Sequence, residues 1–225
     1  MVDAYEIFLN KFNIRHEDII EFGIKESKFV EKSNVKQKWE LLKSSIITGD
    51  QNVFIRGYGR DAKGTNLYLE MYEELYGHSN FIKDSTNNNI PTKVIKELTG
   101  YGKNVKTDNK YERIKNFQVS HIFGRTKNPY AFAAPWNIIY IPKIVDPFTG
   151  HESKGELTKK FQQQFQRHFI NYYSEYILDF NSIMAETLPH INKYLAENIG
   201  NKRFSMDLLN QFEPIEIEEN PNMNE

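Results

Sequence analysis

A histidine and an asparagine stand in two neighbouring apolar segments of VSHIFGRTKNPYAFAAPWNIIYIP, residues 119–142. His121 lies in the first segment, Asn137 opens the second, and a basic loop that contains proline separates them. An imidazole has an unperturbed pKa near neutrality, so His121 can serve as a general base without large tuning. Amide oxygens suit Mg²⁺, which needs only one or two protein ligands, and Asn137 can supply one. The pair therefore predicts metal-assisted hydrolysis of a phosphodiester.

Two short strands must position this pair. The apolar runs predict strands at about 115–123 and 136–142, and a hairpin of these strands brings His121 opposite Asn137. Turn residues in DPFTGHESKG then lead to a long helical region. In that region one wide apolar stripe recurs every four residues, formed by Leu157, Phe161, Phe165 and Phe169.

Helices and one further short strand are predicted for the rest of the chain. Residues 3–50 show helical spacing of apolar residues after an Asp3 cap, and NVFIRGYG predicts a strand near 52–57. NLYLEMYEELYG predicts a helix that ends at Gly77. We expect an α+β fold, mostly helical, with the hairpin-plus-helix unit at its centre.

Composition indicates a cytoplasmic protein. Cysteine is absent from the 225 residues, which excludes disulfides and thiolate metal sites and fits a reducing compartment. No apolar run approaches membrane-spanning length, so no membrane partner is expected. The net charge of −1 hides an asymmetry, because residues 51–130 carry 13 Lys and Arg against 8 Asp and Glu. This basic middle is compatible with nucleic-acid contact and also with ordinary solvated surface.

Three residues in order resemble the HNH nucleases, also called the ββα-metal or His-Me finger superfamily. SHI with His121, PWNII with Asn137 and TGHESKG with His151 match a base histidine, a second-strand asparagine and a His or Asn on the following helix. Ser120 stands where many members have a metal-binding Asp, so the pattern is more similar to members that bind one cation through an asparagine. The resemblance implies a Mg²⁺-dependent endonuclease in which Mn²⁺ substitutes, with Asn137 and His151 as metal ligands.

The size of the chain resembles that of type II restriction endonucleases, which pair identical subunits on double-stranded DNA. A homodimer that acts on double-stranded DNA is therefore expected. No GxxxxGK[ST] motif is present, so no nucleotide cofactor is expected. The expected regions are a helical DNA-recognition region at 1–112, the catalytic unit at 113–155, C-terminal helices at 156–212 and an acidic, disordered tail at 213–225.

Basic residues in two loops are the predicted DNA contacts. The glycine-rich segment FIRGYGRDAKGTN presents Arg56, Arg60 and Lys63 to phosphates. Arg125 and Lys127 follow His121 closely, and Arg125 is expected to stabilise charge on the scissile phosphate.

Two other functions fit the sequence. A PD-(D/E)XK nuclease uses an acid-x-Lys triplet, which 61–63 or 152–154 provides with Asp50 or Asp146 upstream, but both triplets are predicted to lie in loops. A DNA- or RNA-binding protein without catalysis uses the same basic loops, with His121 as a core histidine bonded to a backbone carbonyl. Cleavage that Mg²⁺ supports separates the nucleases from the binding protein.

Overall fold

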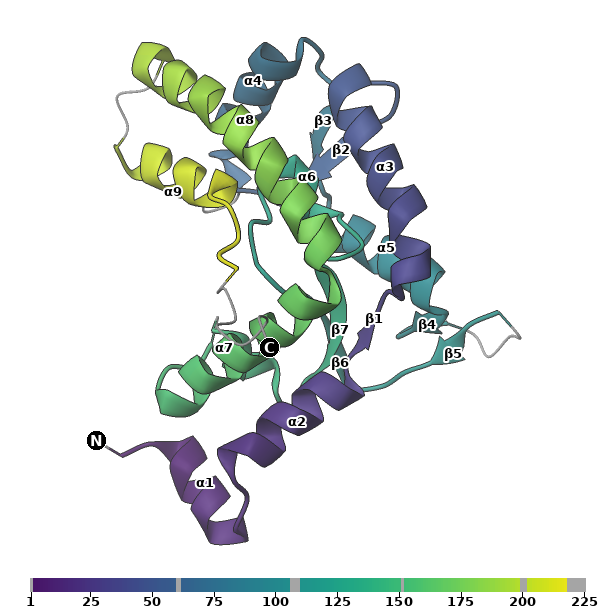
Figure 1. Ribbon diagram of the computed structural model, residues 1–225, viewed down its shortest axis with the longest axis vertical. Coiled ribbons are helices and arrows are strands. Elements are labelled where there is room, and N and C mark those ends of the chain that lie inside the picture. Colours follow the sequence, from purple (N-terminus) through teal and green to yellow (C-terminus); the bar gives the residue numbers. More distant parts are fainter. Residues whose placement is uncertain (1, 60–61, 106–109, 151, 199–201, 218–225) are drawn as a thin grey trace, which may run out of the picture.

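The computed structural model describes residues 2–59, 62–105, 110–150, 152–198 and 202–217. The fold is α+β and mostly helical, as predicted (Figure 1). In chain order the elements are α1 (Ala4–Phe12), α2 (His16–Glu26), β1 (Lys28–Phe29), α3 (Lys32–Thr48), β2 (Val53–Ile55), α4 (Thr65–Tyr76), β3 (Phe81–Lys83), α5 (Asn89–Thr99), β4 (Tyr101–Gly102), β5 (Glu112–Arg113), β6 (Phe117–His121), α6 (Pro129–Phe132), β7 (Ile138–Pro142), η2 (Asp146–Thr149), α7 (Glu156–Tyr172), α8 (Ser174–Asn198) and α9 (Lys202–Phe212).

The predicted hairpin is the centre of an antiparallel sheet with strand order β1-β7-β6. Phe117 pairs with Pro142 at one end of the β6–β7 ladder, and His121 pairs with Ile138 at the other. Two parallel pairs complete the strands of the described residues, β2 with β3 and β4 with β5. The strand predicted near 52–57 is β2, whereas β1, β3, β4 and β5 are too short to leave a periodic pattern.

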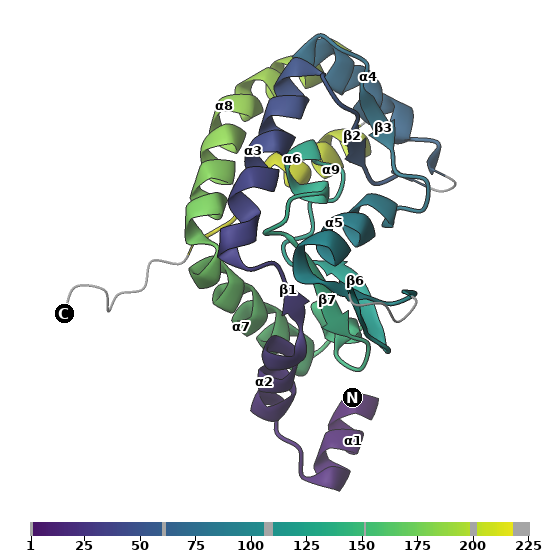
Figure 2. The same cartoon turned by 90° about the vertical axis from the view of Figure 1, so that its right-hand side faces the viewer.

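Strand β7 is buried on both faces, which explains its unbroken apolar sequence. Ile139 and Ile141 belong to the main core, on the side of α7. Ile138 and Tyr140 belong to a smaller cluster with Ile95 of α5. Figure 2 shows α7 and α5 on different sides of this sheet.

The apolar stripe predicted on α7 is confirmed, because all four of its residues are buried. Helix α2 packs closely against it at Gly23, where an added Cβ would lie 2.6 Å from the Phe161 ring. The same core extends from Leu9 of α1 to Ile215 beyond α9. The four regions expected from the sequence therefore share one core.

Two predicted helix boundaries are confirmed. Oδ1 of Asp3 accepts hydrogen bonds from the backbone N–H groups of Tyr5 (2.9 Å) and Glu6 (3.4 Å), which caps α1. Gly77 ends α4 with a φ of 73°, a left-handed conformation that glycine adopts without strain. Within the described residues, no helix is both long and apolar enough to cross a bilayer.

The start of the C-terminal tail differs from the disordered segment expected from residue 213. Ile215 is buried, and its backbone N–H and carbonyl both pair with the Asn181 amide at 2.7 and 2.8 Å. The acidic composition of this segment concealed the apolar anchor that Ile215 provides. Residues 218–225 lie outside the described residues.

Candidate functional site

The hairpin brings His121 and Asn137 to the same end of the sheet. His121 is the last residue of β6, and the N–H of the next residue, Ile122, donates to the Asn137 carbonyl at 2.8 Å. The connection between the strands includes the short helix α6, which Asn128 caps by accepting from the Tyr130 N–H at 2.8 Å. The predicted pair therefore lies where the chain leaves one strand and enters the next.

Asn137 is fully buried and holds both sides of this connection. Its Oδ1 accepts from the Phe123 N–H (2.9 Å), and its Nδ2 donates to the carbonyls of Gly124 (3.0 Å) and Ala131 (2.9 Å). These three bonds give Asn137 a positioning role for residues 123–131. A cation at Asn137 would need its oxygen, which already accepts a hydrogen bond in a closed environment.

His121 is oriented by the Phe132 backbone. Its Nε2 lies 2.9 Å from the Phe132 carbonyl oxygen, and the two rings stack with centroids 5.5 Å apart and planes 16° apart. A carbonyl oxygen can only accept, so Nε2 carries the proton and the basic nitrogen of the neutral ring is Nδ1. The contact is the backbone bond expected of a core histidine, and it is also how a general base is held in one tautomer.

A small hollow lies beside His121, between the hairpin and α7. Its volume is about 10 Å³, roughly the space that one water needs. Its polar lining residues are Ser120, His121, Thr149, Gln162 and Gln166. Gln166 Nε2 donates to the Ile122 carbonyl (3.0 Å), and Gln162 Nε2 donates to the Thr149 carbonyl (2.8 Å). Neither glutamine was among the predicted site residues, although each directly follows a phenylalanine of the apolar stripe.

The polar groups around this hollow are hydroxyls, amides and the His121 imidazole. No Asp or Glu is among its described lining residues, and the described chain contains no group of three or more His, Cys, Asp or Glu that could hold a metal. Magnesium sites in proteins normally use at least one carboxylate, so these residues do not by themselves fit a Mg²⁺ site. His151, the second predicted ligand, lies outside the described residues. Metal dependence therefore stays a prediction.

Arg125 holds the C-terminal segment in the structure. Its Nε donates to the Glu213 carbonyl (2.9 Å), Nη2 to the Pro214 carbonyl (3.0 Å) and Nη1 to the Phe123 carbonyl (3.1 Å). Burial lowers the pKa of Arg125, which the nearby Glu213 opposes. These bonds use three of the five N–H donors of the guanidinium, so the predicted contact with the scissile phosphate would fall to the two that remain.

The glycine-rich segment adjoins the hairpin connection. The Arg56 backbone N–H donates to the Thr126 carbonyl at 2.9 Å, and the Arg56 side chain is half-buried. Lys63 is exposed, while Arg60 lies outside the described residues. The two predicted contact loops are therefore neighbours in space.

Lys127 forms an ion pair and a cation–π contact within the protein. Its Nζ lies 3.2 Å from the Asp207 carboxylate and 5.0 Å from the centre of the Tyr58 ring. This ion pair ties the connection to α9, so the Lys127 charge is already balanced.

A second basic surface gathers lysines and aromatic rings at the opposite end of the hairpin. We call it the basic strip, and it consists of Lys28, Lys96, Lys103, Lys110 and Lys143 with Tyr101, Tyr111 and Phe117. Lys28 lies 5.8 Å from the Tyr101 ring centre and 6.0 Å from that of Phe117, and its Nζ lies 3.8 Å from the Glu26 carboxylate. Burial and the charge of Lys143 lower the pKa of Lys103, so these two like charges are close. The sequence signal was the mixture of Lys and Tyr in 101–115, which the prediction of phosphate contacts did not use.

The fold and site define an α+β protein with an oriented histidine at the end of a central hairpin. The chain belongs to the family described as Uncharacterised protein PM1201, whose model matches residues 30–219. A relative of that description from Pasteurella multocida (strain Pm70) is 42% identical over 219 residues, which are 97% of this chain and 96% of that protein. No solved structure matches the chain. The matched range includes the hairpin and α7, and begins after α2.

Proposed function

We propose that the protein is an endonuclease of the HNH type that hydrolyses phosphodiester bonds of double-stranded DNA, with His121 as the general base. The observation that carries the proposal is the His121 imidazole, which the Phe132 carbonyl orients at the end of a hairpin whose connection Asn137 fixes. Cleavage of both strands at one palindrome would need two active sites, so a homodimer belongs to the same proposal.

The chemistry follows from the tautomer of His121. Nδ1 takes a proton from a water whose oxygen attacks phosphorus, and the bond from phosphorus to the leaving oxygen breaks. The imidazolium keeps Nε2–H on the Phe132 carbonyl, and this hydrogen bond strengthens when the ring becomes charged. The leaving oxygen receives its proton from solvent. Asn137 acts in this scheme as a positioning residue.

Magnesium belongs to the proposal only because the resemblance to the HNH nucleases implies a Mg²⁺-dependent enzyme. A bound Mg²⁺ would stabilise charge on the phosphate, but the hydroxyls and amides beside His121 give no reason to assign it a step. For the acid-x-Lys alternative, the triplet at 152–154 is not supported by position, since Glu152 and Lys154 are exposed and lie between η2 and α7 instead of on a strand. Asp61 of the other triplet lies outside the described residues.

A nucleic-acid-binding protein without catalysis is the second candidate. His121 is only 8% exposed, beside a hollow of about 10 Å³ that cannot admit a phosphodiester without movement. The basic strip is compatible with this function as well as with a nuclease.

The test is cleavage of phage and supercoiled plasmid DNA by the full chain with Mg²⁺, Mn²⁺ or EDTA. The wild type should give discrete bands with either metal and none with EDTA. His121→Ala should be at least ~100-fold slower, because general-base catalysis typically contributes this much. His168→Ala, a change at an exposed histidine of α7, should cut normally. DNA binding without cleavage by the wild type would favour the second candidate, and cleavage retained by His121→Ala would place the base elsewhere.

A further inference from the structure

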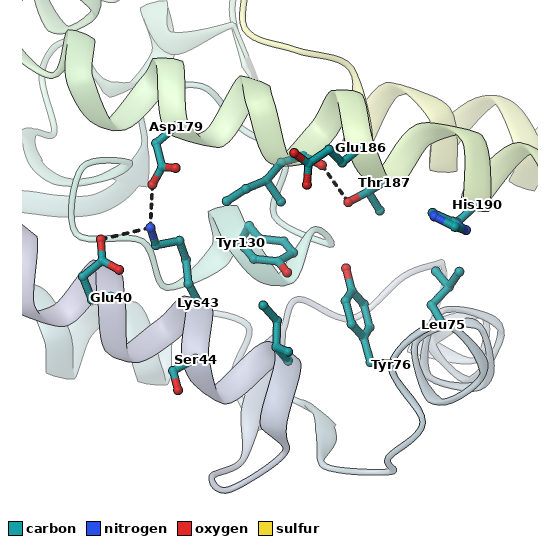
Figure 3. A pocket seen from close by; sticks show the side chains of 12 residues that line it. Glu40, Lys43, Ser44, Leu75, Tyr76, Tyr130, Asp179, Glu186, Thr187 and His190 are labelled. Atoms are coloured by element: carbon teal, nitrogen blue, oxygen red, sulfur yellow. Dashed lines mark hydrogen bonds and ion pairs between the residues drawn. The ribbon is translucent and has the colours of Figure 1, made fainter.

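A cavity of about 600 Å³ lies between α3, α4, α6 and α8 and shares no lining residue with the hollow beside His121 (Figure 3). Its volume is in the range of small-molecule sites. Ile47, Leu75 and Ile183 contribute apolar walls. The rings of Tyr76 and Tyr130 form another wall, with centroids 6.4 Å apart. These walls suit a ligand with an apolar or aromatic body.

Negative charge exceeds positive charge around this cavity. Three carboxylates, one lysine and His190 line it. Lys43 already lies 2.7 Å from Asp179 and 2.9 Å from Glu40, so its charge is balanced. Asp179 also accepts from the Trp39 Nε1–H at 2.7 Å, which fixes this arrangement between α3 and α8.

The third carboxylate, Glu186, forms no ion pair within the described residues. It is exposed and stands on α8 near Tyr130, as Figure 3 shows. A cationic group in the cavity would therefore meet a carboxylate that no lysine or arginine of the described chain already neutralises.

The Tyr76 hydroxyl gives an independent indication of a ligand. It is buried and makes no hydrogen bond of acceptable geometry in the described part of the chain, although the hydroxyls of Tyr130 and Thr187 are its neighbours. The hydroxyl proton of Thr187 is already donated to the Ile183 carbonyl, at 2.7 Å from Oγ1. Burial raises the pKa of Tyr76, so this hydroxyl stays neutral and can accept an N–H.

We propose that this cavity binds a small organic cation, a primary ammonium carried on an aromatic or aliphatic body. The body packs against the faces of Tyr76 and Tyr130, where a cation also gains from the ring electrons. The ammonium donates to the Tyr76 hydroxyl, and Glu186 balances its charge. This site does not depend on the proposed nuclease activity.

The test uses benzylamine as the probe, with benzyl alcohol and benzoate as neutral and anionic matches of the same body. A titration of the full ¹⁵N-labelled chain at neutral pH should give saturable shifts on α3, α4 and α8. Benzyl alcohol should bind at least about tenfold more weakly, since it lacks the charge. Equal shifts from all three probes, or no saturable shifts from benzylamine, would overturn the proposal.

Three variants make the assignment specific. Glu186→Gln should weaken benzylamine binding by about two- to fivefold, as expected for an exposed ion pair. Tyr76→Phe should weaken it by a similar factor without loss of folding stability, because the hydroxyl removed has no well-formed bond. Glu197→Gln, at an exposed acid of the same helix outside the cavity, should bind like the wild type. Unchanged binding by Glu186→Gln would contradict the charge assignment even if Tyr76→Phe behaved as expected.

Discussion

Asn137 fixes the connection between β6 and β7 through three side-chain hydrogen bonds to the backbone. Removing its amide would leave the buried Phe123 N–H and the carbonyls of Gly124 and Ala131 without their partners. Each unsatisfied buried group costs about 1–3 kcal/mol. Asn137→Ala should therefore lower the free energy of unfolding by about 3 kcal/mol or more, measured by urea denaturation. Asn192→Ala, at an exposed position of α8, should change it little.

The same variant separates positioning from metal binding. If Asn137 were a metal ligand and nothing more, Asn137→Ala would fold normally and elevated Mg²⁺ or Mn²⁺ would restore cleavage. If Asn137 is a positioning residue, Asn137→Ala should lower the free energy of unfolding, and added Mg²⁺ or Mn²⁺ should not restore cleavage. The second result is the one that the three hydrogen bonds of Asn137 favour.

The connection between β6 and β7 is fastened to the C-terminal segment by Arg125, which has a left-handed φ of 54°. Hydrogen bonds from a charged group contribute about 1.5–3 kcal/mol when buried, and less here because Arg125 is half-buried. Arg125→Ala should speed amide exchange at Glu213 and Ile215 and lower the free energy of unfolding by about 1–2 kcal/mol.

Lys154→Ala, at an exposed loop position, is the control for Arg125→Ala and should leave amide exchange unchanged. If Arg125→Ala instead slowed single-turnover cleavage and left amide exchange unchanged, the result would support the contact between Arg125 and the scissile phosphate that the sequence predicts. The two readouts distinguish an anchor from a catalytic cation.

Helix α2 begins with a pH-sensitive cap. Hydrogen bonds from the Arg15 side chain (2.7 Å) and backbone N–H (2.9 Å) lower the pKa of Asp18 to about 2, below its usual 3.8. Because the folded pKa is the lower one, the contribution of Asp18 is fully present above about pH 4 and is lost as the pH falls through 2. Asp18→Asn should lower the urea midpoint at pH 7.

The difference in urea midpoint between Asp18→Asn and the wild type should shrink between pH 4 and pH 2. Glu26→Gln, near the other end of α2, is the matched control. A difference that stayed constant down to pH 2 would mean that the Asp18 charge does not stabilise the cap.

Elements with a long periodic signal were predictable, and short ones were not. The α7 stripe and the buried strand β7 follow from apolar spacing over many residues. Strands β1, β4 and β5 have only two residues each, so tertiary contacts decide them. His121 and Asn137 could be predicted from the sequence as a pair. The Phe132 carbonyl could not, because a backbone group carries no sequence signal, and the two α7 glutamines could be assigned to the site only from the fold.

In the whole molecule, the main core joins one face of the central sheet to helices from both halves of the chain, and the smaller cluster lies on the other face. The hairpin lies between them, with His121 at one end of β6 and Phe117 of the basic strip four residues away at the other. At about 3.3 Å per residue, this separation is on the order of 13 Å. A duplex that contacts the basic strip therefore comes within reach of the His121 end of the sheet.

The proposed DNA contact can be assigned to one of the two basic surfaces by neutralising lysines on each. Lys103 and Lys143 repel each other in the protein alone, and a phosphate between them would relieve this repulsion. Lys103→Gln and Lys143→Gln should each weaken DNA binding and lower the slope of log K against log salt by about one unit, the counterion-release effect of one phosphate contact. Fluorescence anisotropy with a labelled duplex over a salt series measures both quantities.

Two matched variants complete this test. Lys63→Gln neutralises an exposed lysine of the predicted glycine-rich segment, and Lys159→Gln neutralises an exposed lysine of α7. If the basic strip binds DNA, Lys159→Gln should keep the wild-type slope, and Lys63→Gln will lower it only if the duplex also reaches that segment. If Lys63→Gln lowers the slope while Lys103→Gln and Lys143→Gln do not, the DNA lies along the glycine-rich segment as the sequence predicted, and the basic strip is a solvated surface.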